Sequence, residues 1–335
     1  MSDIEELKEL LSVPRKIVIT THQRPDGDAM GSSLALYHYL KENNHHPTVI
    51  SPTEYPSFLC WMPGNDSVVI YEKEPKRCTQ IVEESELIFC ADFNKLERLD
   101  VLGNIIEASS AIKVLIDHHL EPNDFATFTF WSAQACSTAE LVYDFIVRMG
   151  DKNVISKDIA TCIYAGILTD TDRFRIPSTS PLVHRIAAEL LELGINHTMI
   201  YEEVYETFSE SRLRFFGFCI REKMQINKEL KTGIISLETD DLKKFHIQTG
   251  DTEGLVNYPL WIKGIRLSVL IIQRPDGVKL SFRSKGDFDV NELANKNFKG
   301  GGHRNAAGGK SLLSVAETRE QLISILAPLK KQLNP

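Results

Sequence analysis

Apolar residues in the first part of the chain form short runs that alternate with segments of helical spacing. A short apolar run bounded by turn residues is typical of a buried strand, whereas apolar residues three and four positions apart indicate a helix. We therefore expect strands at 16–20, 46–51, 68–71, 86–91, 111–116 and 127–131. Helices are expected at 34–40, 99–108, 137–149, 157–168 and 180–193. This alternation predicts an α/β domain with a doubly wound, mainly parallel sheet.

The pattern changes beyond a further helical segment at 209–223. Strand-like stretches follow at 233–237, 265–273 and 278–283, and a last helix is expected near 317–326. The tetrapeptide RPDG at 274–277 is typical of a tight hairpin turn between two strands. The second part of the chain therefore predicts a mixed fold of strands and helices.

The length and composition of the chain suit a globular protein with about two domains. It has 335 residues, of which 42% are hydrophobic and 25% are charged, as in most folded proteins. We predict a larger domain at 1–208, a linker helix at 209–228 and a smaller mixed α/β domain at 229–335. The active-site cleft is expected between the two domains.

Carboxylate and imidazole side chains follow four of the apolar segments, where α/β proteins place their chemistry. In chain order the groups are His22, Asp26 and Asp28; Asp92; Asp117, His118 and His119; and Asp170 and Asp172. Each group alone is explained by a turn or a helix cap. Four such groups, all with hard oxygen or imidazole donors and none with a thiolate, favour a divalent metal site.

Five short motifs resemble those of a known family. HQRPDGD, ADFN, DHH and TDTDRF are similar, in this order, to the four motifs of the DHH phosphoesterase superfamily. GGGHRNAAGG at 300–309 resembles the signature of the DHH-associated C-terminal domain. In length and layout the chain is most similar to the bacterial nanoRNase group, oligoribonucleases that also act as 3'-phosphoadenosine-5'-phosphate phosphatases.

The resemblance implies a site for two divalent cations. One cation would be held by His22, Asp26 and Asp92, and the other by Asp28, Asp92, His118 and Asp170. Asp92 would then bridge the two cations. The donor set, rich in carboxylate with imidazole, favours Mn²⁺, with Mg²⁺ or Co²⁺ as alternatives.

The neighbouring polar residues are expected to act on the substrate or on the ligands. By the resemblance, His119 would hydrogen-bond a phosphate oxygen or the leaving group, although a surface role stays open. Asp117 is expected to orient the adjacent imidazole, so that Asp92, Asp117 and His119 form the predicted catalytic set. Asp172 stands where the nanoRNase group usually has glycine. Its carboxylate either adds to the site or points to solvent.

The C-terminal motif predicts a place for phosphate. Glycines let the backbone approach an anion closely, and the small residues Ala306, Ala307 and Gly308 suit the start of a tightly packed helix. Histidine and arginine side chains add donors for phosphate oxygens. The expected substrate-binding residues are Arg283, Gly300, Gly301, Gly302 and His303.

The net charge of the chain and its apolar runs limit which partners are expected. The net charge is −8, whereas a protein that follows long duplex nucleic acid usually displays a basic face. No apolar run approaches the ~20 residues of a membrane span, and the acidic amphipathic start is unlike a secretory signal. We expect a cytoplasmic protein that has no membrane partner and acts on short single-stranded RNA or small phosphorylated nucleotides. The oligomeric state is left open, with a homodimer among the alternatives.

Aromatic side chains that could stack bases are Phe174, Tyr258, Trp261 and Phe282, although packing in the core is the better expectation for each.

Three functions remain in competition. The favoured one is a metal-dependent phosphodiesterase and phosphatase that converts short oligoribonucleotides to nucleoside 5'-monophosphates and 3'-phosphoadenosine 5'-phosphate to AMP. Other enzymatic alternatives are an inorganic pyrophosphatase, an exopolyphosphatase-like hydrolase, or a phosphodiesterase for linear or cyclic dinucleotides. The third alternative is a non-catalytic nucleotide-binding regulator. The GGGH motif favours a nucleotide substrate, and the full ligand set disfavours the regulator.

Overall fold

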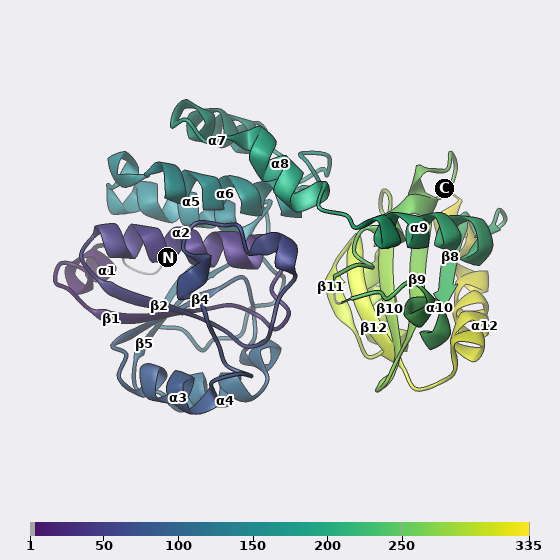
Figure 1. Cartoon of the computed structure of the whole chain (residues 1–335), viewed down its shortest axis with the longest axis horizontal. Helices are drawn as coiled ribbons and strands as arrows, with labels where there is room; N and C mark the ends of the chain where they lie inside the picture. Colours follow the sequence, from purple (N-terminus) through teal and green to yellow (C-terminus); the bar gives the residue numbers. More distant parts are fainter. Residues whose placement is uncertain (1–3, 249, 335) are drawn as a thin grey trace. The chain divides into compact units, whose positions relative to one another are not determined.

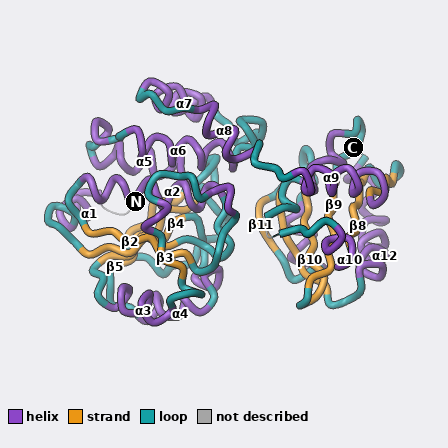
Figure 2. Tube along the Cα trace, viewed as in Figure 1, coloured by secondary structure: helices purple, strands orange, loops and turns teal. Residues whose placement is uncertain are grey.

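The computed structural model describes residues 4–248 and 250–334. The first three residues, residue 335 and residue 249 belong to the predicted domains but lie outside the described residues. The chain forms two compact units, Met1–Thr207 and Phe208–Pro335. Each unit contains one six-stranded sheet with helices packed against it (Figures 1 and 2).

The sheet of the first unit is parallel throughout, as the sequence predicts. Its strand order is β3-β2-β1-β4-β5-β6. The strands are β1 (Lys16–Thr20), β2 (His46–Ser51), β3 (Val69–Ile70), β4 (Leu87–Ala91), β5 (Ile112–Asp117) and β6 (Phe128–Trp131). The order along the chain reverses between β1 and β4, at the centre of the sheet. Ligands of open α/β sheets bind beyond the carboxyl ends of strands at such a reversal.

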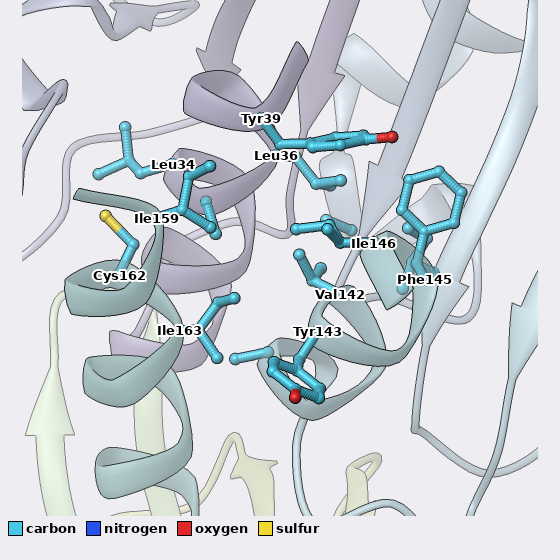
Figure 3. Close-up of a cluster of buried hydrophobic side chains, with 14 of the residues drawn as sticks. Leu34, Leu36, Tyr39, Val142, Tyr143, Phe145, Ile146, Ile159, Cys162 and Ile163 are labelled. Atoms are coloured by element: carbon cyan, nitrogen blue, oxygen red, sulfur yellow. The ribbon is translucent and has the colours of Figure 1, made fainter. Parts of the chain in front are cut away.

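Helices cover both faces of this sheet. They are α1 (Ile4–Leu10), α2 (Gly27–Glu42), α3 (Pro75–Glu83), α4 (Val101–Ala108), α5 (Thr138–Met149), α6 (Lys157–Asp170), α7 (Pro181–Glu192) and α8 (His197–Tyr205). Helices α2, α5 and α6 lie on one face and α3 and α4 on the other (Figure 1). Because neighbouring residues of a strand point to opposite faces, Ile17 and Ile19 join one core while Val18 joins the other. Figure 3 shows the first of these cores, with Leu34, Phe145 and Ile163 from three helices.

Helix α2 begins earlier than the expected range of 34–40. The carboxylate of Asp26 accepts hydrogen bonds from the backbone N–H groups of Asp28 and Ala29, both at 3.1 Å, and so caps the helix. Asp28 therefore lies in the first turn of α2 and not in a loop. Glycine is unfavourable in the interior of a helix. For that reason the sequence did not predict a helix over this first part.

Two glycines allow α2 and α6 to pack closely. A Cβ atom at Gly31 would lie 2.6 Å from the carbonyl oxygen of Cys162 and 2.9 Å from the nitrogen of Gly166. A Cβ atom at Gly166 would lie 2.6 Å from the Cβ of Ala139 and 3.0 Å from Oδ1 of Asp28. Real Cβ atoms do not tolerate such distances to backbone atoms or to the Cβ of another residue, because interiors are packed as tightly as organic crystals. Both positions therefore require glycine.

The second unit contains a mixed sheet of order β11-β12-β10-β9-β8-β7. Its strands are β7 (Met224–Asn227), β8 (Thr232–Leu237), β9 (Leu267–Arg274), β10 (Gly277–Ser284), β11 (Gly301–His303) and β12 (Ala306–Ser311). Among the described strands of this sheet, β8 and β9 pair in parallel and the other neighbours are antiparallel. The helices are α9 (Glu210–Phe218), α10 (Thr239–Lys244), α11 (Val290–Asn297), α12 (Val315–Leu326) and α13 (Lys330–Leu333). The predicted hairpin is present, since Arg274 pairs with Gly277 across a two-residue turn.

The expected helix start at Ala306, Ala307 and Gly308 is wrong, because these residues form β12. The next residue of β12, Gly309, packs closely, since a Cβ there would lie 2.7 Å from the Cβ of Phe298.

The segment predicted as a linker helix belongs to the second unit. Phe215 and Phe216 of α9 are buried in one core with Ile235 and Leu237 of β8. A π-helical turn at Cys219–Lys223 then leads directly into β7. The predicted range of 209–228 therefore contains a helix that packs on the second sheet and a strand that is part of this sheet. Among the described residues, no helix has both the length and the apolar composition needed to cross a lipid bilayer.

Candidate metal centre

The carboxyl edge of the parallel sheet brings the predicted ligands together. His22 follows β1, Asp92 follows β4, and His118 follows the last residue of β5. The start of α2 adds Asp26 and Asp28, and the end of α6 adds Asp170. Parallel strands end at the same edge of a sheet, so residues far apart in the sequence share one site.

The first group of ligands consists of His22, Asp26 and Asp92. Each of these residues offers one donor atom, and the three donor atoms lie within 4.8 Å of one another. Nε2 of His22 lies 3.4 Å from Oδ2 of Asp92. This group contains the three ligands that the resemblance assigns to one cation.

The second group is centred on His118. Its Nε2 atom lies 3.8 Å from Oδ2 of Asp28, 3.6 Å from Oδ1 of Asp92 and 3.4 Å from Oδ2 of Asp170. The donors of Asp28, Asp92 and His118 also lie within 4.8 Å of one another. Asp92 thus belongs to both groups, with Oδ2 facing His22 and Oδ1 facing His118.

The two imidazole rings are held by backbone carbonyl groups. Nδ1 of His22 is 2.7 Å from the carbonyl oxygen of Gln23, and Nδ1 of His118 is 3.3 Å from that of Ala135. A carbonyl oxygen only accepts hydrogen bonds, so Nδ1 carries the proton in each ring. In a neutral ring the lone pair is then on Nε2, the nitrogen that faces the carboxylates, as a metal ligand requires.

The first turn of α5 fixes two of the carboxylates. The backbone N–H groups of Thr138 and Ala139 donate to the two oxygens of Asp28, at 2.6 and 2.9 Å. The hydroxyl of Thr138 donates to Oδ1 of Asp92 at 2.8 Å. Free N–H groups at a helix start favour negative charge. Ser137, at the expected start of this helix, caps it by accepting from the N–H of Glu140.

The backbone of Asp92 adopts an unusual conformation. Its φ is +67°, in the left-handed region that residues other than glycine rarely occupy. Its N–H donates to the carbonyl oxygen of Ile116 at 3.0 Å. Such conformations cost of order 1–3 kcal/mol and persist where the surrounding structure holds them, often at functional sites.

The electrostatics of the site suit a cation. Burial and the nearby charges of Asp92, Asp170 and Asp26 raise the pKa of Asp28 well above its usual value. Burial opposes ionisation of Asp92 too. Its hydrogen bond with His22 and the nearby charges of His119, His22 and His118 nevertheless lower the pKa of Asp92 overall. A cluster of buried carboxylates is costly unless positive charge compensates it. The donor types and their mutual proximity therefore fit divalent cations.

His119 and Asp117 form a pair beside the metal ligands. Nδ1 of His119 donates to Oδ1 of Asp117 at 2.7 Å and lies 3.7 Å from Oδ1 of Asp92. Asp117 is fully buried. Nε1 of Trp131 donates to the carbonyl oxygen of His119 at 2.6 Å and holds its backbone. Asp117 thus hydrogen-bonds the imidazole of His119, and its role in orienting the adjacent imidazole stays a prediction.

Asp172 lies outside both ligand groups. Its carboxylate forms ion pairs with Arg173, at 2.8 Å, and with Arg175. Asp172, Arg173 and Phe174 all have positive φ, at 46°, 65° and 61°. Glycine adopts this conformation without strain, which is consistent with the glycine that the family resemblance implies at this position. The chain instead holds an aspartate there with two arginines.

Substitution of Asp172 should separate the effects of strain and ion pairing. Asp172→Ala keeps the left-handed backbone and loses the ion pairs, so the free energy of unfolding should fall by about 1–2 kcal/mol. Asp172→Gly also loses the pairs but relieves the strain, so it should stay within about 1 kcal/mol of the native value. Urea denaturation followed by circular dichroism measures both. A glycine variant less stable than the alanine variant would contradict this account.

The residues expected to bind phosphate lie in the second unit. Gly301, Gly302 and His303 form β11, and the N–H of Gly302 donates to Oδ1 of Asn291 at 2.8 Å. A Cβ at Gly300 would clash with the carbonyl oxygen of Gly308. Arg283 is half-buried on β10, and its Nη1 donates to the carbonyl oxygen of Phe282 at 2.9 Å. Strand packing alone therefore accounts for part of the glycine run.

Thr138 is a further residue of the site that its local sequence does not indicate. Its hydroxyl and N–H contact Asp92 and Asp28, which are distant in sequence. The helix start at Ser137 was visible in the sequence. The residues that this helix start contacts depend on how α5 packs against α2 and the sheet.

Comparison with known proteins identifies the family. Residues 16–167 match the model of the DHH family N-terminal domain, and residues 234–332 match that of the DHHA1 domain. The bifunctional oligoribonuclease and PAP phosphatase NrnA of Thermus thermophilus is 30% identical over 300 residues, which cover 89% of this chain and 85% of that protein. NrnA of Bacillus subtilis is 27% identical over 331 residues, 98% of each chain.

A solved structure resembles the chain over almost its whole length. It is an exopolyphosphatase-related protein from Bacteroides fragilis, with 40% sequence identity and a TM-score of 0.96. The match covers 99% of this chain and 97% of that one. Together with the two domain matches and the ligand groups, these similarities show that the chain belongs to the DHH family of phosphoesterases and carries a DHHA1 domain.

Proposed function

We propose that this metal-dependent phosphoesterase hydrolyses short oligoribonucleotides to nucleoside 5'-monophosphates and converts 3'-phosphoadenosine 5'-phosphate to AMP. The observation that carries the proposal is the position of Asp92, whose two oxygens face two separate groups of ligands. Two relatives of similar length are named as enzymes with both activities.

The ligand groups assign the residues that would hold the cations. His22, Asp26 and Asp92 would hold one, and Asp28, Asp92, His118 and Asp170 the other. Bound divalent cations neutralise phosphoryl oxygens and supply an activated water at neutral pH. Carboxylate with imidazole and no thiolate suits Mn²⁺ best, with Mg²⁺ or Co²⁺ as alternatives.

The protein's own groups orient the substrate and move the proton. With Nδ1 of His119 bonded to Asp117, the other ring nitrogen is the one that can hydrogen-bond a phosphate oxygen or protonate the leaving oxygen. Asp117 is buried and accepts the hydrogen bond from Nδ1 of His119, which fixes the orientation of the ring. Thr138 and Ala139 hold the carboxylates, so little reorganisation is needed during the reaction.

The second domain is proposed to bind substrate phosphate. Arg283 supplies a fork of donors, and His303 supplies an imidazole on the short strand β11. The backbone at Gly300, Gly301 and Gly302 carries no side chain that would keep an anion away. In this proposal the second domain also sets the length of RNA accepted and the choice between RNA and 3'-phosphoadenosine 5'-phosphate.

A substrate panel with Mn²⁺ tests the proposal. It contains a 5'-phosphorylated RNA dimer, 3'-phosphoadenosine 5'-phosphate, a linear and a cyclic dinucleotide, pyrophosphate and polyphosphate. We expect the highest kcat/KM on the RNA dimer and on 3'-phosphoadenosine 5'-phosphate. Faster phosphate release from pyrophosphate or polyphosphate would overturn the proposal. Polyphosphate is an essential member of the panel because the similar Bacteroides fragilis protein is named as exopolyphosphatase-related. Absence of turnover on the whole panel would favour a nucleotide-binding regulator.

A further inference from the structure

Trp261 departs from the expectation that it packs in the core. It is 62% exposed, and the following residue, Ile262, is 38% exposed. Its ring contacts that of Tyr258, with 4.5 Å between the centroids and 38° between the planes. Phe282, by contrast, is fully buried, and Phe174 packs on Tyr164 and His184. Among the four aromatic candidates, Trp261 therefore offers the most exposed ring.

Basic side chains gather at the same end of the second sheet. Lys231 precedes β8, Arg266 precedes β9 and Lys285 follows β10, and these strands are neighbours in the sheet (Figure 1). The N–H of Arg266 donates to the carbonyl oxygen of Lys231, and the N–H of Lys285 to that of Arg266, both at 2.8 Å. The strand ends thus place these three cations in adjacent positions.

The basic row adjoins Trp261. Nζ of Lys285 donates to the carbonyl oxygen of Leu260, the residue before the tryptophan. Lys263 follows two residues after Trp261 and is exposed. Nζ of Lys231 lies 3.9 Å from the position of a Cβ on Gly264. We call Trp261, Lys231, Lys263, Arg266 and Lys285 the Trp261 surface.

The cations of this surface are not neutralised by the protein. Among residues 4–248 and 250–334, no carboxylate forms an ion pair with Lys231, Lys263, Arg266 or Lys285. Asp287, close by in the sequence, pairs with Arg304 at 3.4 Å. In a chain of net charge −8, an unpaired basic group around an exposed indole is suited to an anionic partner.

The surface is continuous with the residues proposed to bind phosphate. The N–H of Ser284, which precedes Lys285, donates to the carbonyl oxygen of Asn305 at 3.0 Å. Nδ2 of Asn305 donates to the carbonyl oxygen of Gly286 at 2.9 Å. His303 lies two residues before Asn305 in the turn between β11 and β12. Lys285 therefore lies between this turn and Trp261.

We propose that the Trp261 surface binds further nucleotides of a short single-stranded oligoribonucleotide, in addition to the one being hydrolysed. One base stacks on Trp261, and backbone phosphates contact the four cations. Aromatic rings bind bases of any identity and basic grooves follow the backbone, so this surface would select RNA by length and not by sequence. The inference rests on the proposed function because it names RNA as the substrate.

Equilibrium binding of a fluorescein-labelled RNA pentamer in EDTA tests the inference without turnover. Trp261→Ala should weaken binding at least about fivefold, as expected when one base loses its stacking partner. Lys231→Ala and Lys263→Ala should each reduce the slope of log affinity against log salt by about 0.7, the loss of one phosphate contact. Leu312→Ala and Lys310→Ala are the controls, since Leu312 is 85% exposed and both positions lie near the opposite, hairpin end of the sheet.

Kinetics with Mn²⁺ give the second measurement. Trp261→Ala should raise KM for the pentamer at least about fivefold and leave kcat/KM for 3'-phosphoadenosine 5'-phosphate unchanged. Equal effects on both substrates, unchanged pentamer affinity, or no pentamer binding by the native chain would overturn the inference. Equally tight, Trp261-dependent binding of an acidic peptide would overturn it as well. Pentamer binding without hydrolysis would instead refute the proposed function and leave the RNA surface in place.

Discussion

Asp92→Asn should reduce hydrolysis of an RNA dimer by at least about 10²–10³-fold, the cost of removing one preorganised electrostatic group. Asparagine preserves the volume of the side chain but removes its charge, and its amide nitrogen cannot bind a cation. Because the two oxygens of Asp92 face His22 and His118 separately, one substitution disturbs both ligand groups. Affinity for Mn²⁺ should therefore fall together with the rate.

Calorimetric titration with Mn²⁺ and steady-state kinetics measure the two effects in the same protein. Asp124→Asn is a matched control, since Asp124 is exposed in a loop of the same unit. Circular dichroism establishes that the Asp92→Asn chain is folded, as expected for a substitution that preserves the volume of the side chain. A variant that hydrolyses the dimer at the native rate would show that the reaction takes place elsewhere.

Removal of divalent cations should abolish hydrolysis and lower the melting temperature of the first unit. Without a cation, burial and then the nearby charges of Asp92, Asp170 and Asp26 disfavour ionised Asp28, which raises its pKa. A ligand at about 1,000 times its dissociation constant stabilises a fold by about 4 kcal/mol. For a unit of this size, that corresponds to about 8–16 °C.

Differential scanning calorimetry with EDTA and with added Mn²⁺ measures this shift. The second unit contributes none of the ligands in the two groups, so its transition should move little. In Asp92→Asn the Mn²⁺-dependent shift should be much smaller than in the native chain. Equal melting temperatures with and without cation in the native chain would exclude a structural contribution from the metal.

Much of the first unit could be predicted from its sequence. Its strands are apolar on both faces because helices cover both, so they appear as continuous apolar runs bounded by polar residues. Such strands pair in parallel, and their carboxyl ends converge on one edge. His22, Asp92 and His118 could be found for that reason, although they are far apart in the chain.

The features that could not be predicted depend on tertiary packing. Helix α2 starts at Gly27 because its first turn packs against α6, whereas local preference disfavours glycine there. The hydroxyl of Thr138 reaches Asp92 only because the start of α5 lies beside the sheet edge. The run Ala306–Gly308 forms β12 by pairing with β10 and β11, although its small residues also suit a helix start. In these cases the local sequence is compatible with more than one structure.

The close packing at Gly31 and Gly166 has a consequence for how the protein can vary. Asp28 lies on α2 and Asp170 ends α6, so the spacing of these two carboxylates depends on the absence of two methyl groups where α6 packs against α2 and α5. In a library of random variants selected for turnover, both positions should remain glycine as strictly as the carboxylates themselves. The two glycines therefore limit the evolution of this site, although neither has a side chain that could take part in catalysis.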